Sequence, residues 1–279
     1  MKKTLYVSDL DGTLLNSDSE ISQASVDIIN NLIEKHNVLF SIATARTPAT
    51  VVPLMSEIRS NLPFVVMTGA TLWDNGFVGQ HYMRKEEVDI LSDICKRHGL
   101  RPFFYTYCDD KIRSYHSPKM DAYESNFVAL RANSPIKEFV FDEVIPERNK
   151  EHAMLMFVTG DYEEMGVAYE EAKREVPCSM TYYRDIYDHS VGFLEVMAEG
   201  VSKAAAVSEL KEQVGADRVV VFGDSPNDLS MKAVADLFVA PENASDEVLK
   251  VADAIIGVNN SDSVARWMEK DVDICAKEK

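Results

Sequence analysis

The residues with the clearest chemical potential are Asp9, Asp11, Gly12 and Thr13, which directly follow the apolar run 5–7. Carboxylates that leave a buried strand are costly unless a cation neutralises them. In an extended chain, residues i and i+2 point to the same side, so the two carboxylates would face one site. Such oxygens suit Mg²⁺, and one carboxylate could also attack or transfer a proton. The alternative for this motif alone is an ordinary Asp-Gly turn.

A second candidate group, Thr44-Ala45-Arg46, follows the apolar stretch 38–43. A hydroxyl and free backbone N–H groups at a junction between a strand and a helix suit a phosphate oxygen. Arg46 is a candidate for contact with the substrate. The alternative is that Thr44 merely ends the strand.

Two further groups follow much later in the chain. Lys203 stands near the start of a helix predicted over 201–214, where a cation opposes the helix dipole and an anionic partner is therefore expected. A solvated surface lysine is the alternative. Asp224 and Asp228 lie in the stretch 223–228, directly after the apolar run 219–222. They would leave a second buried strand in a tight turn and provide the other half of a carboxylate site for a cation. The alternative is a plain turn.

The elements that must position these residues alternate between strands and helices. Strands are predicted over 38–43, 64–67, 193–197, 219–222, 237–240 and 254–256. Helices are predicted between them, one of them starting at a Ser22 cap and another at Thr47-Pro48. This alternation predicts an α/β fold with a doubly wound parallel sheet and crossover helices. Ligands of such sheets bind beyond the carboxyl ends of the strands, where Asp9 and Thr44 are expected.

Residues 83–189 differ in character, since they are rich in predicted strands and aromatic side chains. A hairpin around Asn75-Gly76 precedes them. We therefore predict a separate α+β domain over 83–189, inserted into a catalytic core formed by 1–82 and 190–279.

Composition excludes several classes of protein. The 279-residue chain carries a formal net charge of −17, which disfavours nonspecific binding to nucleic acid or to anionic membranes. Its apolar runs are too short to cross a bilayer, and no signal peptide is evident, so a cytoplasmic location is expected. The four scattered cysteines argue against a zinc site or a disulfide framework. The oligomeric state is not indicated.

Taken together, the ordered set DLDGT (9–13), Thr44, Lys203 and GDSPND (223–228) resembles the four motifs of the haloacid dehalogenase-like (HAD) hydrolase superfamily. The large insertion between Thr44 and Lys203 resembles the Cof-type branch of sugar-phosphate phosphatases. The resemblance implies a Rossmann-like core with an inserted cap domain. It also implies a Mg²⁺-dependent phosphatase that acts on small phosphorylated metabolites, expected to be sugar phosphates.

The resemblance also implies a role for each motif residue. Asp9 would be the nucleophile that forms an aspartyl-phosphate, and Asp11 the general acid and then the general base. Mg²⁺ would sit on the Asp9 carboxylate, the Asp11 backbone carbonyl and Asp224, with Asp228 supporting the metal shell or Lys203. The residues implied to hold the phosphoryl group are Leu10, Thr44, Ala45, Lys203 and Asn227.

This sequence departs from the family pattern in two places. Ala45 stands where relatives often have glycine, which should matter little for a contact through the backbone amide. Thr68 stands where relatives often have asparagine, which puts in doubt a substrate contact made by that side chain.

Two rival functions remain open at this stage. A phosphomutase would share the aspartyl-phosphate but return the phosphoryl group to a sugar. A noncatalytic sensor of phosphorylated ligands is disfavoured by the intact pair of Asp9 and Asp11.

Overall fold

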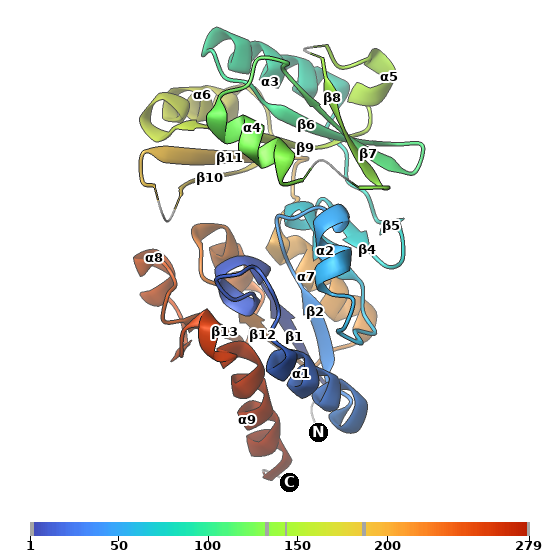
Figure 1. Ribbon diagram of the computed structural model, residues 1–279, viewed down its shortest axis with the longest axis vertical. Coiled ribbons are helices and arrows are strands. Elements are labelled where there is room, and N and C mark those ends of the chain that lie inside the picture. The colour runs from blue at the N-terminus through green and yellow to red at the C-terminus, as the bar shows by residue number, and fades with distance from the viewer. Residues whose placement is uncertain (1–2, 132–133, 143, 186–187, 278–279) are drawn as a thin grey trace. The chain divides into compact units, whose positions relative to one another are not determined.

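The computed structural model describes residues 3–131, 134–142, 144–185 and 188–277, which form two compact units (Figure 1). The core unit comprises the chain up to Val78 and from Ser202 onward, and the inserted unit comprises Gly79–Val201. The limits predicted from the sequence were 82/83 and 189/190. The strand expected at 193–197 as part of the core, β11 (Val191–Met197), instead pairs antiparallel with two strands of the inserted unit.

The core unit is built on a five-stranded parallel sheet with the strand order β14-β13-β12-β1-β2. Its strands are β1 (Thr4–Ser8), β2 (Leu39–Ile42), β12 (Arg218–Phe222), β13 (Leu237–Pro241) and β14 (Ala254–Ile256). In the centre, Val7 of β1 lies opposite Val221 of β12 and Ser41 of β2. The carboxyl ends of these three strands therefore meet at one edge of the sheet, as predicted.

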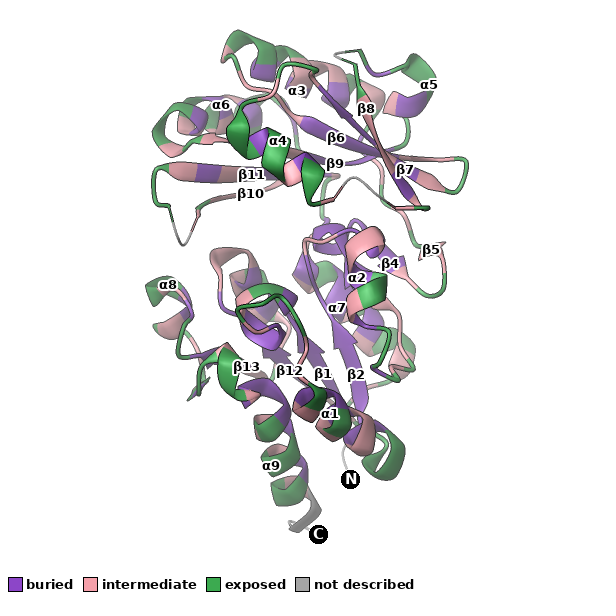
Figure 2. Ribbon diagram, in the orientation of Figure 1, coloured by how far each residue is buried: buried purple, intermediate pink, exposed green. Residues whose placement is uncertain are grey.

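Helices and short turns cover both faces of this sheet. They are α1 (Gln23–His36), α2 (Pro48–Leu54), α7 (Lys203–Val214), α8 (Asp246–Leu249), α9 (Ser263–Lys277), η1 (Leu10–Leu14), η2 (Met67–Gly69), η3 (Pro226–Ala233) and η4 (Asn259–Ser261). Tyr6 packs in the cluster with α1, α2 and α9, whereas its neighbours Leu5 and Val7 pack in the cluster with α7 and α8. Figure 2 shows that the strands between these layers are buried. The Ser22 hydroxyl caps α1 by accepting from the Ser25 backbone N–H, as predicted.

The strand predicted at 64–67 does not extend the parallel sheet. β3 (Phe64–Val66) belongs to a separate antiparallel sheet with β4 (Thr71–Trp73) and β5 (Phe77–Val78). Its link to the core sheet is one parallel bridge between Val65 and Ala43. The chain reverses in η2, where Thr68 adopts a φ of 57°, so β4 returns directly along β3.

The inserted unit contains a six-stranded sheet with the order β10-β11-β9-β6-β7-β8, antiparallel except for the β7–β8 pair. Besides β11, its elements are α3 (Lys85–Arg97), β6 (Phe103–Cys108), β7 (Lys111–His116), α4 (Ala122–Ala129), β8 (Lys137–Phe141), α5 (Glu147–Lys150), β9 (Ala153–Asp161), α6 (Tyr162–Glu175) and β10 (Ser179–Arg184). Apolar residues of α3 and α6 pack on one face, against Phe104, Val158 and Leu194. On the other face, Phe127 of α4 packs against Phe157. The predicted α/β fold with an inserted α+β domain is confirmed.

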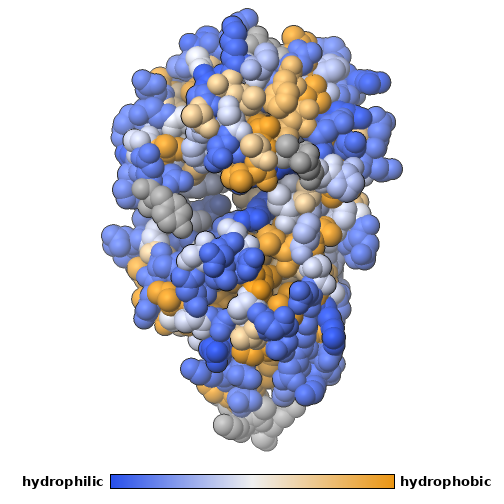
Figure 3. Space-filling view, in the orientation of Figure 1, coloured by the Kyte–Doolittle hydropathy of each residue, from blue (hydrophilic) through white to orange (hydrophobic). Residues whose placement is uncertain are grey.

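The surface is largely hydrophilic, in agreement with the net charge of −17. Figure 3 shows hydrophilic side chains over much of the visible face of each unit, with smaller hydrophobic areas between them. Within the described ranges, no helix has the length and apolar character needed to cross a membrane. All four cysteines carry free thiols.

Candidate active site

The buried side chain of Lys203 links the first sequence motif, 9–13, to the last, 223–228. Its Nζ donates to Oδ1 of Asp9 and to Oδ1 of Asp228, each at 2.7 Å. All three side chains are less than a tenth exposed. Lys203 is the first residue of α7, so the anionic partner predicted from its place at a helix start is present. A solvated surface lysine is excluded.

The turn after β12 is organised by Asp228. Its Oδ2 accepts from the backbone N–H groups of Asp224 and Ser225, at 3.0 and 3.1 Å. Gly223 permits this turn, because a Cβ there would lie 2.5 Å from the Cβ of Asp228. Both oxygens of Asp228 are thus used within the protein, one by Lys203 and one by the turn.

The turn after β1 brings the first motif against the second. Gly12 has a φ of 75°, and a Cβ at this position would lie 2.4 Å from Oδ2 of Asp224. The next residue, Thr13, donates from its hydroxyl to Oδ1 of Asp224 at 2.8 Å. Gly12 therefore leaves space for the Asp224 carboxylate and Thr13 binds it, so the motif is not an isolated Asp-Gly turn.

The side chain of Asp11 does not join the carboxylate cluster. It is 55% exposed and forms a two-pronged ion pair with Arg46, at 2.7 Å from Nε and 2.5 Å from Nη2. The expectation that Asp9 and Asp11 face one side as in an extended strand is therefore corrected. The chain leaves the strand at Asp9 and turns within η1, so alternation no longer applies.

The remaining predicted phosphate-binding residues lie at the same edge of the core sheet. The hydroxyl of Thr44 accepts from the backbone N–H of Arg46 at 3.1 Å, and Ala45 between them is half-buried. Asn227 is half-buried, and its Oδ1 accepts from the Ser225 hydroxyl. Leu10 is fully buried in the apolar core, so a role for Leu10 must rest on its backbone amide.

A comparison of the sequence with models of protein families identifies the family of this chain. The model of the haloacid dehalogenase-like hydrolase family matches residues 6–268, nearly the whole chain. The chain belongs to this family. Its predicted place in the Cof-type branch of the HAD superfamily and its predicted class, a phosphatase enzyme, are confirmed.

Relatives resemble the HAD chain over its full length. A 5-amino-6-(5-phospho-D-ribitylamino)uracil phosphatase of Bacillus subtilis is 28% identical and covers 94% of this chain and 93% of its own. The crystal structure of a HAD-like hydrolase from Bacteroides thetaiotaomicron matches with a TM-score of 0.75 and 26% identity, over 96% and 99% of the two chains. A HAD subclass IIB sugar phosphatase, 19% identical with a TM-score of 0.74 over 96% and 98%, shares the fold.

Burial and mutual repulsion dominate the electrostatics of the HAD site. Burial raises the pKa of Asp9 well above its usual range; Lys203 opposes this shift, and the neighbouring carboxylates reinforce it. Burial, followed by the charge of Asp228, raises the pKa of Asp224 to about 7. The site thus has more negative charge than Lys203 alone can neutralise.

The donor set fits a hard divalent cation. One carboxylate oxygen each of Asp9, Asp224 and Asp228 lies within 4.8 Å of the others. Among the described residues, Oδ2 of Asp9 and Oδ2 of Asp224 accept no hydrogen bond, whereas both oxygens of Asp228 do. Asp9 and Asp224 are therefore the side chains suited to hold Mg²⁺, and Asp228 is suited to hold Lys203.

Sequence reasoning missed one residue that supports the site. The side-chain amide of Asn243, in the loop after β13, donates to the carbonyl oxygen of Gly12 at 2.7 Å. Its Oδ1 accepts from the backbone N–H of Asn259, so Asn243 ties the first motif to two later loops. Its position shortly after a predicted strand end was the available signal.

Proposed function

We propose that the chain is a Mg²⁺-dependent phosphatase that hydrolyses small phosphorylated metabolites, foremost sugar phosphates, through a phosphoryl group carried on Asp9. The observation that carries this proposal is the state of the Asp9 carboxylate. One oxygen is fixed by Lys203, and the other accepts no hydrogen bond from the described residues. A buried carboxylate held in this way is oriented for attack.

In the first step, an oxygen of Asp9 forms a bond to the phosphorus of the substrate. The bond between phosphorus and the alcohol oxygen breaks, and that oxygen takes a proton from Asp11. Lys203 offsets the repulsion between the carboxylate and the phosphate. Thr44, the amides of Leu10 and Ala45, and Asn227 donate to the phosphoryl oxygens.

In the second step, Asp11 accepts a proton from a water molecule whose oxygen attacks the phosphorus. The bond between phosphorus and Asp9 breaks, which releases inorganic phosphate and restores both carboxyl groups. Splitting the hydrolysis in this way replaces one difficult step with two easier ones.

Mg²⁺, held by Asp9 and Asp224 when bound, supplies positive charge against the phosphoryl oxygens. The raised pKa values of both side chains agree with this assignment, because a site built for a cation is overcharged without it. The backbone carbonyl of Asp11 is a further proposed ligand.

Sugar phosphates are proposed as substrates because the fold is that of a sugar phosphatase and the insertion is of the Cof type. The Bacillus subtilis relative is named for a phosphorylated ribityl compound, which is also a phosphomonoester of a polyol chain. Phosphate-release assays over sugar phosphates, this ribityl compound and nucleotides would rank the classes. We expect the highest kcat/KM for a phosphorylated sugar or polyol.

The mechanism is tested by replacing Asp9. Asp9→Asn keeps the shape of the side chain but removes the nucleophile, so turnover should fall by at least about a thousandfold. Mass spectrometry of acid-quenched wild-type enzyme should find a phosphoryl group on the Asp9 peptide. Asp273→Asn, at an exposed position of α9, is the matched control and should behave as wild type. A fully active Asp9→Asn protein would refute the proposal.

A further inference from the structure

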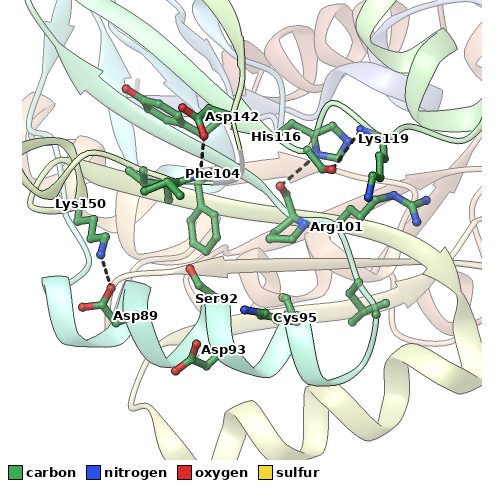
Figure 4. Close-up of a pocket in the computed structure, with 18 residues that line it drawn as sticks. Asp89, Ser92, Asp93, Cys95, Arg101, Phe104, His116, Lys119, Asp142 and Lys150 are labelled. Carbon is green, nitrogen blue, oxygen red and sulfur yellow. Dashed lines mark hydrogen bonds and ion pairs between the residues drawn. The ribbon is translucent and has the colours of Figure 1, made fainter.

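A cavity of about 700 Å³ lies entirely within the inserted unit. Its walls come from α3, the loop before β6, the ends of β6 and β7, and the segment around α5 (Figure 4). No residue of the Asp9–Asp224–Lys203 cluster lines it. Its size falls within the range of about 300–1,000 Å³ that is common for small-molecule sites.

The floor of this cavity is apolar and well fixed. Phe104 of β6 and Tyr115 of β7 are cross-strand neighbours in register, and both are buried. The Tyr115 hydroxyl is held by a hydrogen bond from the side chain of Asn149. Leu100 and Ile145 add to the apolar lining. Such a floor suits a flat, apolar molecular body.

Two cationic side chains lie at one end of the cavity. Figure 4 shows Arg101 and Lys119 beside each other, with Phe104 between them and the opposite end, where Asp89 and Lys150 lie. Arg101 is fixed by ion pairs, including one at 2.9 Å to buried Glu124. Among the residues that the structure describes, Lys119 takes part in no ion pair, so its ammonium is available to a ligand.

The charge of the lining contrasts with that of the chain. Four cationic and three anionic side chains line the cavity, although the whole chain carries a net charge of −17. Lys150 and Asp89 neutralise each other at 2.5 Å, and Arg101 is already paired with Asp121 and Glu124. Among the described residues, Lys119 is therefore left to pair with an anionic ligand at this place.

We propose that this cavity is a second small-molecule site, separate from the hydrolytic site, that binds an amphipathic anion. The apolar body of the ligand lies on Phe104 and Tyr115, and its carboxylate, phosphate or sulfonate group lies beside Lys119 and Arg101. The proposal does not rest on the chemistry of Asp9.

The test uses the fluorescent dye anilinonaphthalene sulfonate, which combines an anionic group with flat apolar rings, and the full-length protein. We expect saturable binding of one dye per chain. Lys119→Glu reverses the free charge and should weaken binding by about fivefold to tenfold. Ser92→Trp places a large side chain in the cavity from the α3 wall and should abolish the binding.

Three controls make the result decisive. Lys173→Glu makes the same charge change at an exposed position of α6, outside the cavity, and should leave the affinity unchanged. Asp9→Asn should also bind the dye as the wild type does, which separates this site from the proposed hydrolysis. Thermal unfolding confirms that each variant is folded, and Lys119→Gln serves as a milder variant. Dye binding that is absent, or unchanged by both Lys119→Glu and Ser92→Trp, would overturn the proposal.

Discussion

Arg46 donates hydrogen bonds to both carboxylate oxygens of Asp11, with Nε 2.7 Å from Oδ2 and Nη2 2.5 Å from Oδ1. This geometry fixes the orientation of the Asp11 side chain, and it also occupies both of its oxygens. In the proposed mechanism Asp11 must give a proton to the leaving alcohol. The pair therefore has to open during each turnover, and Arg46 becomes free to contact the substrate when it does.

Replacing Arg46 should impair turnover more than stability. Arg46→Ala removes the partner that orients Asp11, so we expect kcat to fall by about tenfold. The pair is partly exposed, so the free energy of unfolding should change by less than about 1 kcal/mol. Steady-state kinetics and urea unfolding measure the two effects. Arg266→Ala, which removes an exposed ion pair with Asp262, is the control, and an unchanged kcat in Arg46→Ala would contradict the orienting role.

Replacing Lys203 should reduce both the stability and the turnover of the protein. Lys203→Met leaves the buried carboxylates of Asp9 and Asp228 without their shared cation, which we expect to cost about 3–5 kcal/mol of unfolding free energy. Turnover should fall by at least about a hundredfold, because the charge proposed to face the phosphate is lost. Urea unfolding and phosphate release measure these losses.

A second substitution separates the two roles of Lys203. Adding Asp228→Asn to Lys203→Met removes one uncompensated charge and should restore part of the stability without restoring turnover. Lys211→Met, in the last turn of the same helix, is the control. Recovery of activity in the double variant would show that Lys203 acts only on the fold.

The stability of the metal-free protein should decrease as pH rises. The pKa of Asp224 is about 7 in the folded protein against a usual 3.8, so the folded state holds this proton more tightly than the unfolded state does. The resulting stabilisation is complete below about pH 4 and is lost by about pH 7. Asp9 contributes with the same sign. Melting temperatures of EDTA-treated protein across this range measure the effect.

Mg²⁺ should reverse this trend, because protons compete with the cation for the same oxygens. We expect the rise in melting temperature on addition of Mg²⁺ to be larger at pH 8 than at pH 5. Asp224→Asn should flatten the pH dependence of the metal-free protein and abolish most of the response to Mg²⁺. An equal response to Mg²⁺ in this variant would place the cation elsewhere.

Gly12→Ala should block the site. The added Cβ would lie 2.4 Å from Oδ2 of Asp224, and the backbone at this position has a φ of 75°. We expect phosphate release to fall by at least about a hundredfold and the stability to fall by about 2 kcal/mol or more. Gly215→Ala, with a φ of 60° and no atom within 4 Å of the added Cβ, carries similar backbone strain without the clash. It should cost about 1 kcal/mol and leave turnover intact.

Local sequence patterns predicted the parts of the site that depend on strand ends. Asp9, Thr44 and Asp224 could be placed at one sheet edge, because consecutive parallel strands bring their carboxyl ends together. The position of Lys203 at a helix start predicted an anionic partner. What could not be predicted is the direction of Asp11, which depends on a turn geometry that the spacing rule for extended chains does not describe.

The errors in the fold have a common physical cause. The strand patterns at 64–67 and 193–197 predict strands but specify neither their partners nor their directions. β3 pairs with the strand that returns directly after it, and β11 continues the antiparallel ladder of β9 and β10. Partner choice is a tertiary property, and with β11 in its sheet the compact inserted unit extends to Val201.

The strand order of the core sheet also governs when the enzyme becomes competent during its synthesis. β1 leaves the ribosome long before its neighbour β12, which begins only at Arg218. The inserted unit is one continuous segment, so it can complete its sheet while the core still lacks three of its five strands. Lys203 and Asp224 also arrive late. A nascent chain therefore carries Asp9, the proposed nucleophile, for most of its synthesis without Lys203 and Asp224.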